Sequence, residues 1–296
     1  EGIATDGVYL YIADSGNHAI RKIEIVSGNV VTLAGKRGQA SYQDGTGTNA
    51  MFKAPIGITI LDGALYVSDT DNHVIRRVDK NSGETITVAG AASTAGNTDG
   101  FGVSALFNFP FGITNDGEFL YIADTFNHTI RRLEIQTGEV ITLAGKAGEG
   151  GYTDGSLMDA RFYYPSDLTV KGGELFIADI GNDVIRIIDL SQGTVSTIAG
   201  TPRVSGAADG PVGIGKFDSP ADLAVIGDYI YVTDMNNNSI RSVNISTGEL
   251  TTIAGAPSYT GSADDSGDNS RFSTPGGITI EGSTLYIADT FNHTIR

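Results

Sequence analysis

The chain repeats itself every 55 residues, and no insertion or deletion disturbs the period. In each copy an aspartate closes an apolar run, and an Ile-Arg pair follows it. The aspartates are Asp14, Asp69, Asp124, Asp179, Asp234 and Asp289, and the arginines are Arg21, Arg76, Arg131, Arg186, Arg241 and Arg296. Residues that recur in every copy are expected to serve the repeat itself and not a single active site.

One repeat predicts four short strands, at 57–60, 65–69, 74–78 and 85–89, with tight turns at 62–63 and 82–84. The second run lacks polar alternation and is therefore expected to be covered on both faces. Such four-stranded sheets bury their faces by stacking as the blades of a propeller. We predict an all-β fold, with the single domain 1–296 built from blades at about 1–35, 57–90, 112–145, 167–200, 222–255 and 277–296, the last one partial.

Long connections join the fourth strand of one repeat to the first strand of the next. The connection at 90–110 carries Asp99-Gly100, Phe107 and Pro110, and the same residue types recur in its counterparts. Irregular connections of about twenty residues are uncommon in compact domains. We therefore expect a packed loop, called the crossover below, that its phenylalanine anchors between neighbouring blades.

Charge and composition exclude several classes of function. The net charge is −16, which disfavours nucleic acid as a partner. The chain has no cysteine, so disulfides, thiolate metal sites and cysteine nucleophiles are excluded. No apolar stretch has the length of a membrane helix, and we expect no membrane insertion.

The segment that contains the Ile-Arg pair resembles the signature of the NHL-repeat family. The resemblance implies a six-bladed β-propeller, and the long crossovers are similar to those of bacterial extracytoplasmic members, which implies a periplasmic, cell-surface or secreted protein. Two copies depart from the signature at its histidine, where they carry Asp183 and Asn238. The matching segments are 17–21, 72–76, 127–131 and 292–296.

The sixth repeat stops at Arg296, within its third predicted strand. A propeller that closes by exchanging its termini would take the missing outer strand from residues upstream of Glu1. We therefore expect the chain to be a segment of a longer one, with an upstream strand or further domains as partners.

The recurrent Asp and Arg lie seven positions apart, close enough to pair across a hairpin. The simplest interpretation is a structural latch that satisfies turn amides and the guanidinium in every blade. The alternative is a ring of carboxylates that binds a hard cation such as calcium. Residues 234–238 resemble part of a calcium loop but lack its closing Gly and Glu. Calcium is the one cofactor that the sequence leaves open.

All four histidines occupy the signature position: His18, His73, His128 and His293. The family includes a propeller lyase that uses zinc held by histidines, and such a site needs converging, non-repeated ligands. Histidines at one recurrent turn do not converge, so we predict structural roles for them and no enzyme activity. Asp264, Asp265 and Asp268 lie in one loop. They form either a solvated acidic segment or a group of carboxylates for catalysis.

Function is expected where the repeats differ. The turns between the second and third strands, and the crossovers, should open on one face and present aromatic and apolar residues there. We predict a non-catalytic interaction or sensor scaffold that binds a protein or glycan on this face. The alternatives for the protein are a metal-dependent lyase or lactonase, and a duplicated or designed propeller without a ligand. The alternative for the aromatic residues is that their rings fold back and stabilise their own loops. The candidate residues are Phe126, Met235, Phe291, Ile180, Tyr42, Tyr152, Phe101, Leu157 and Tyr259.

Overall fold

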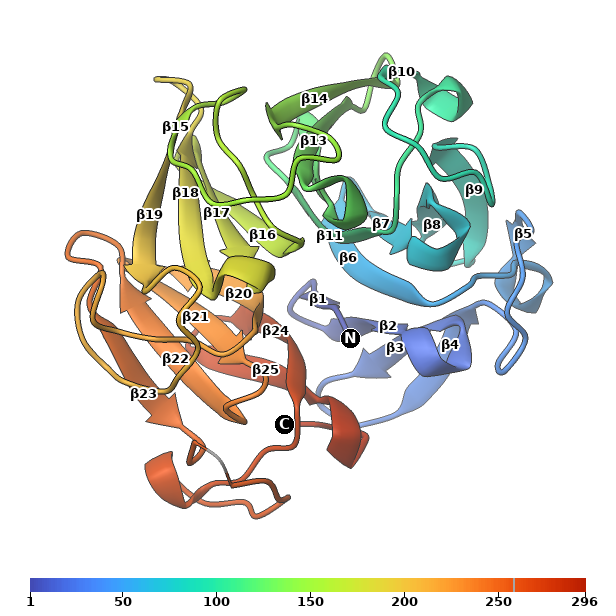
Figure 1. The fold of residues 1–296 in the computed structure, drawn as a ribbon. Helices are drawn as coiled ribbons and strands as arrows, with labels where there is room; N and C mark the ends of the chain where they lie inside the picture. The colour runs from blue at the N-terminus through green and yellow to red at the C-terminus, as the bar shows by residue number, and fades with distance from the viewer. Residues whose placement is uncertain (258) are drawn as a thin grey trace. The chain divides into compact units, whose positions relative to one another are not determined.

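The computed structural model describes residues 1–257 and 259–296 and has an all-β fold. Six antiparallel sheets of three to five strands follow one another along the chain, and each is one blade of a β-propeller. The described residues contain short 3-10 turns but no α-helix. The chain packs as two compact units, unit 1 at 1–148 and unit 2 at 149–296, each with three consecutive blades (Figure 1).

Unit 1 contains blades 1 to 3. Blade 1 has β1 (Ile3–Thr5), β2 (Tyr9–Asp14), β3 (Ala19–Glu24) and β4 (Val30–Ala34); blade 2 has β5 (Gly45–Thr46), β6 (Pro55–Leu61), β7 (Ala64–Asp69), β8 (Val74–Asp79) and β9 (Glu84–Ala89); blade 3 has β10 (Gly100–Phe101), β11 (Pro110–Asn115), β12 (Phe119–Asp124), β13 (Thr129–Glu134) and β14 (Glu139–Gly145). The 3-10 turns are η1 (Ser15–Asn17), η2 (Gly47–Asn49), η3 (Thr70–Asn72), η4 (Gly102–Ser104) and η5 (Thr125–Asn127).

Unit 2 contains blades 4 to 6. Blade 4 has β15 (Gly155–Ser156), β16 (Pro165–Lys171), β17 (Glu174–Asp179), β18 (Val184–Asp189) and β19 (Thr194–Gly200); blade 5 has β20 (Pro220–Ile226), β21 (Tyr229–Asp234), β22 (Ser239–Asn244) and β23 (Leu250–Ala254); blade 6 has β24 (Pro275–Glu281), β25 (Thr284–Asp289) and β26 (Thr294–Ile295). The 3-10 turns are η6 (Ile180–Asn182), η7 (Gly267–Asn269) and η8 (Thr290–Asn292).

The four predicted strands of the repeat are confirmed. In blade 2, β7 lies between β6 and β8, pairing Val67 with Ile58 on one side and with Arg76 on the other. All six residues of β7 are buried, as a strand without polar alternation requires. The turn between β8 and β9 holds Gly83 at a φ of 72°, a conformation that glycine adopts without steric cost.

Three crossovers differ from the expected loops, because each of them adds a short strand to the blade that follows it. In blade 2, β5 pairs antiparallel with β9, joining Gly45 to Thr85 and Thr46 to Glu84. β10 and β15 do the same in blades 3 and 4, and a single bridge joins Gly210 to Leu250 in blade 5. Each of these short strands has only two residues, one of them glycine. A segment this short has no hydrophobic periodicity, so the local sequence does not predict its pairing.

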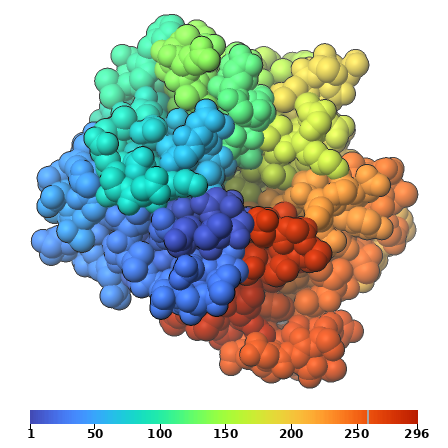
Figure 2. Space-filling view, turned by 180° about the vertical axis from the view of Figure 1, so that it is seen from behind, coloured from blue at the N-terminus to red at the C-terminus, as the bar shows by residue number. Residues whose placement is uncertain are grey.

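The crossover phenylalanine is the anchor that the sequence predicts. Phe52 is fully buried in a core shared by blades 1 and 2, where it packs with Ile20 and Leu65. The surfaces of these two blades are continuous in the space-filling view, dark to light blue (Figure 2). The counterparts Phe107, Phe162 and Phe217 have 0% exposure, and Phe272 has 4%.

Adjacent first strands within unit 1 approach so closely that one position must be glycine. A Cβ built on Gly57 in β6 would lie 2.2 Å from the carbonyl oxygen of Phe111 in β11. Gly2 is restricted in the same way, because a Cβ built on it would lie 2.5 Å from the carbonyl oxygen of Ile56. Contacts this short require a backbone shift, so the glycines here fix the spacing between blades.

Candidate functional site

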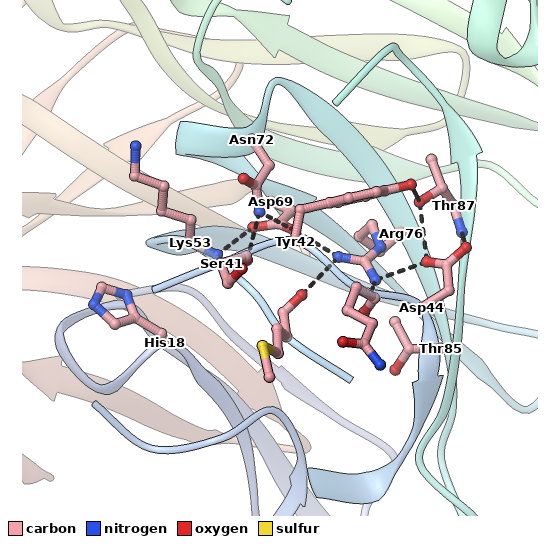
Figure 3. Close-up of polar contacts among 12 residues, drawn as sticks. His18, Ser41, Tyr42, Asp44, Lys53, Asp69, Asn72, Arg76, Thr85 and Thr87 are labelled. Atoms are coloured by element: carbon pink, nitrogen blue, oxygen red, sulfur yellow. Dashed lines mark hydrogen bonds and ion pairs between the residues drawn. The ribbon is translucent and has the colours of Figure 1, made fainter. Parts of the chain in front are cut away.

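Blades 2 to 5 each contain a buried Asp–Arg latch, shown for blade 2 in Figure 3. Asp69 ends β7 and accepts hydrogen bonds from the amide of Lys53 at 2.7 Å, from Asn72 at 2.9 Å and from Arg76 at 2.6 Å. Arg76 binds a second carboxylate, Asp44 of the crossover, at 2.8 Å. The latch therefore ties a strand end, a turn and a crossover together.

The same ion pair recurs along the chain with different degrees of burial. In blades 2 to 5 both side chains have 0% exposure, whereas in blade 1 Arg21 and Asp14 are 3.8 Å apart with exposures of 18% and 26%. The buried pairs beyond blade 2 are Arg131–Asp124 at 2.8 Å, Arg186–Asp179 at 2.9 Å and Arg241–Asp234 at 2.5 Å, and the partly exposed pair Arg296–Asp289 in blade 6 is 3.2 Å long.

Burial raises the pKa of the latch carboxyls above the ordinary range, to about 6 for Asp69, Asp124, Asp179 and Asp234. The paired arginine and the surrounding donors oppose this rise. In Asp69 the two carboxylate oxygens together accept three protein donors, which leaves little capacity for a cation. In residues 1–257 and 259–296, no three His, Asp or Glu side chains form a group that could hold a metal ion.

Two of the signature histidines, His18 and His73, act as hydrogen-bond acceptors between blades. His73 follows η3 in the left-handed conformation, with a φ of 59°, and its Nδ1 accepts the amide of Phe109 in the next crossover at 3.1 Å. His18 accepts the amide of Ala54 in the same way, also at 3.1 Å. Burial lowers the pKa of His73, which favours the neutral imidazole that this bond requires.

The two repeats that depart from the signature keep this function with other side chains. Asp183 accepts the amide of Ser219 at 3.0 Å, and Asn238 accepts the amide of Thr274 at 2.9 Å. Both residues are also left-handed, with φ values of 56° and 53°. The position thus requires a side-chain acceptor that tolerates positive φ, which explains why His, Asp and Asn all occur there.

The turn tips and the crossovers lie on one face of each unit, called the loop-rich face below. In unit 1 the amide of Phe126 donates to the carbonyl of Asn108 at 3.1 Å, and in unit 2 the amide of Gly181 donates to that of Tyr163 at 2.9 Å. The same contact joins Asp71 to Lys53, Asn236 to Asp218 and Phe291 to Ser273.

Three phenylalanines cluster on the loop-rich face of unit 1 and are called the aromatic cluster below. The ring centroids of Phe109 and Phe126 are 4.7 Å apart, and those of Phe111 and Phe126 are 6.4 Å apart. His73 packs edge-on against Phe109 at 4.6 Å. Phe126 is 44% exposed, and the other two rings are half-buried. Phe126 is a predicted binding residue, whereas Phe109 and Phe111 are not, although both occupy positions that vary between repeats.

Two predicted binding residues, Tyr42 and Tyr152, fold back onto the latches. Their rings lie 5.0 Å from the guanidinium of Arg76 and 5.1 Å from that of Arg186, respectively. The Tyr42 hydroxyl also lies 2.8 Å from Thr87 Oγ1 (Figure 3). Of the other predicted residues, Phe101, Tyr259 and Phe291 are 60%, 66% and 68% exposed, Ile180 and Met235 are half-buried, and Leu157 lies just after β15.

The acidic loop at 264–268 contains the blade 6 counterpart of a latch residue. Asp264 lies 2.6 Å from Arg296, as Asp44 lies beside Arg76. Asp265 accepts the amide of Ser266 at 2.7 Å. This cluster is thus partly an extension of the latch.

A pair of carboxyl groups that the sequence analysis missed lies in the first strands of unit 2. Asp167 and Asp222 occupy the position that is glycine in the other four repeats, and they hydrogen-bond to each other. Asp167 also accepts the amide of Leu223 at 3.3 Å, and Asp222 that of Ile278 at 3.1 Å. Desolvation raises the pKa of both groups, that of Asp222 to about 6, and for Asp167 the charge of Asp222 adds to the rise. Aligning the repeats would have revealed the pair.

No helical segment within the described ranges has the length and apolar character needed to cross a bilayer.

The LVIVD repeat model matches residues 1–19, 164–201 and 219–246. Human NHL repeat-containing protein 2 is 29% identical over 334 residues, covering 97% of this chain. The chain spans 44% of the length of that relative.

Solved structures show the same fold at low identity. An auxiliary nutrient binding protein from Bacteroides thetaiotaomicron superposes with a TM-score of 0.73 at 15% identity, over 99% of this chain and 67% of its own. Virginiamycin B lyase from Staphylococcus aureus superposes with a TM-score of 0.56 at 16% identity, over 100% of this chain and 82% of its own. Six consecutive antiparallel sheets, together with these fold likenesses, define a six-bladed β-propeller. Its signature segments and these relatives support an NHL-repeat β-propeller.

Proposed function

We propose that the protein is a non-catalytic binding scaffold that holds a protein or glycan ligand on its loop-rich face, with the aromatic cluster of unit 1 as the main contact. One observation carries the proposal. Phe126 is 44% exposed at a turn tip where the repeats on either side have Asp71 and Gly181. A large apolar ring in a turn that needs none is typical of a recognition residue.

The chemistry around the aromatic cluster suits a ligand with an apolar face and a polar border. The rings supply apolar area worth about 25 cal/mol per Å² removed from water. Lys53 and Asp71, whose charged groups lie 3.8 Å apart, supply exposed charges on the preceding crossover and turn. Underneath, His73 and the buried latch hold the backbone in place, so the ligand would meet a preorganised surface.

An extracytoplasmic location is part of the proposal. The fold likeness to an auxiliary nutrient binding protein supports it, since nutrients are captured outside the cytoplasm. Cell fractionation followed by immunoblotting tests this part, and a purely cytoplasmic signal would contradict it.

A metal-dependent propeller enzyme is the second candidate, favoured by the Asp167–Asp222 pair and by the fold likeness to a lyase. Two carboxyls that share a proton can act as general acid and general base. Turnover of a candidate substrate that is lost in Asp222→Asn and kept in Phe126→Ala would favour this function over the scaffold.

The scaffold proposal is tested by screening the protein on a glycan array and a protein array with two variants. Phe111→Ala/Phe126→Ala should lose the bound ligand, whereas Phe101→Ala, which removes a 60% exposed ring on the short outer strand β10, should keep it. Far-UV circular dichroism confirms that both variants fold. A ligand that binds all three proteins equally, or the absence of any bound ligand, would contradict the proposal.

A further inference from the structure

Blades 4 and 5 carry acids where the repeat otherwise has its spacing glycine. Gly57 leaves no room for a side chain, because a Cβ built on it would lie 2.2 Å from the carbonyl oxygen of Phe111 in the next blade. The corresponding residues of unit 2 are Asp167 in β16 and Asp222 in β20. The first strands of unit 2 are therefore joined through side chains, at a position where those of blades 2 and 3 approach backbone to backbone.

The surroundings of the two carboxyls assign their shared proton. Asp222 accepts the amides of Leu223 at 2.6 Å and Ile278 at 3.1 Å, which favours its ionised form. Asp167 accepts the amide of Leu223 at the longer distance of 3.3 Å. Burial raises the pKa of both groups. The charge of Asp222 and the hydrogen bond between the carboxyls add to the rise for Asp167, whereas this bond opposes the rise for Asp222. Asp167 is therefore the proton donor of the pair.

Hydroxyl groups complete the connection between these first strands. Ser166 Oγ donates to the carbonyl of Ala221 at 2.7 Å. Thr233 Oγ1 accepts the amide of Asp222 at 3.0 Å and donates to the carbonyl of Gly276 in β24 at 2.6 Å. Aliphatic hydroxyls keep their proton throughout the physiological pH range, so the carboxyl pair is the part of this connection that responds to pH.

Other ionisable groups lie on the strands around the pair. Asp179 and Asp234 end β17 and β21 and belong to latches. The Lys171 ammonium donates to the carbonyl of Gly227, and the positive charge of the amino terminus opposes the rise in the pKa of Asp222. The remaining ionisable residues of β16, β17, β20, β21 and β24, besides the pair itself, are Glu174, Tyr229, Tyr231 and Glu281.

We infer that the Asp167–Asp222 pair is a pH-sensitive joint between blades 4 and 5. With one proton the pair holds β16 against β20. Both residues are half-buried, so the proton exchanges with solvent. As pH rises, Asp167 releases it, the two carboxylates repel each other, and the strands separate. Residues 149–164 and 201–219 of the crossovers lead directly into β16 and β20, so the loop-rich face of unit 2 moves with the joint.

Thermal unfolding of an asparagine variant tests the joint, because a carboxamide keeps the shape and the donor of a protonated acid but does not ionise. The protonated pair contributes stability at low pH that is lost as pH rises through its folded pKa. Asp167→Asn avoids this loss. It should melt at the wild-type temperature at pH 5 and several degrees above it at pH 9.

The same experiment contains its controls. The latch carboxyls also titrate, but they are present in both proteins, so their effect cancels in the comparison. Asp228→Asn changes an exposed acid in the turn after β20 and should keep the wild-type pH dependence.

A distance measurement reports the separation of the blades directly. The chain has no cysteine, so Gln192→Cys and Thr247→Cys place two spin labels on exposed turns of blades 4 and 5. Double electron–electron resonance should give a longer or broader distance distribution at pH 9 than at pH 5. With Asp167→Asn added to the labelled protein, the two distributions should coincide.

Two results would overturn the inference. The first is a pH dependence of melting that is the same in Asp167→Asn and in the wild type. The second is a label distance that does not respond to pH, or that responds equally with and without Asp167→Asn. If Asp167→Asn does not fold, Asp222→Asn takes its place, because it removes the same charge repulsion, and the same results decide.

Discussion

Replacing Arg76 by methionine should destabilise the protein strongly, because it removes one partner of a fully buried ion pair. Both Arg76 and Asp69 have 0% exposed side chains, and the guanidinium also binds the carbonyls of Gln43 and Met51 at 2.9 and 3.1 Å. Removing one partner of such a pair costs about 3–5 kcal/mol. At about 2–4 °C per kcal/mol, the melting temperature should fall by roughly 6–20 °C.

The cost of Arg76→Met should increase with pH. Burial holds the folded pKa of Asp69 at about 6, above its ordinary value, so this group's contribution to stability is complete at low pH and is lost as pH rises through 6. Arg76 lowers that pKa, and without it the folded pKa rises further. The variant therefore loses additional stability above pH 6, and its difference from the wild type should be larger at pH 8 than at pH 5.

Urea unfolding followed by far-UV circular dichroism at pH 5 and pH 8 measures both effects. Arg21→Met is the matched control, because it makes the same change at the same repeat position where the pair is 3.8 Å long and partly exposed. Such a pair is worth about 1 kcal/mol or less. If the two variants lose equal stability, or if the Arg76→Met loss does not depend on pH, the argument from burial is wrong.

Two further changes test the blade contacts. His73→Asn should cost less than about 1 kcal/mol, whereas His73→Ala, which leaves a crossover amide without its acceptor, should cost about 1–2 kcal/mol; both are measured by urea unfolding at pH 7.5. Burial lowers the pKa of His73, so its contribution to stability is lost as pH falls through the ordinary value of 6.5, and His73→Asn should reduce the loss of stability between pH 7 and pH 5. Gly57→Ala places a Cβ 2.2 Å from a carbonyl oxygen and should cost about 2–3 kcal/mol in thermal unfolding. Gly16→Ala, with no atom within 4 Å, should change stability by less than about 0.5 kcal/mol.

Features that recur every 55 residues could be predicted from the sequence, because six copies average out local ambiguity. The burial of β7, the turn at Gly83 and the anchoring of Phe52 all follow from apolar runs and turn residues that local physics explains. The short strand β5 could not be predicted in this way. Its pairing depends on a Gly-Thr dipeptide meeting a strand almost forty residues away.

The candidate site could be predicted only in part, because its residues are exceptions to the repeat. Phe126 stands out at its turn, but its contacts with Phe109 and Phe111 depend on the path of the crossover. Tyr42 looks like a surface aromatic in the sequence, yet it lies against Arg76 because the guanidinium offers a flat cation at the crossover. Composition and spacing do not determine which rings fold back.

The short strands β5, β10 and β15 shift the building block of this protein away from its sequence repeat. Each completed sheet takes its last strand from the linker that precedes it, so the physical module is a linker followed by four strands, such as 36–90. Modules should be inserted or deleted just after the fourth strand. A cut just before the first strand would separate the fourth strand of a blade from the linker strand that pairs with it, as β5 pairs with β9. Shuffled genes joined at the wrong boundary would encode sheets that each lack a strand although every residue is present.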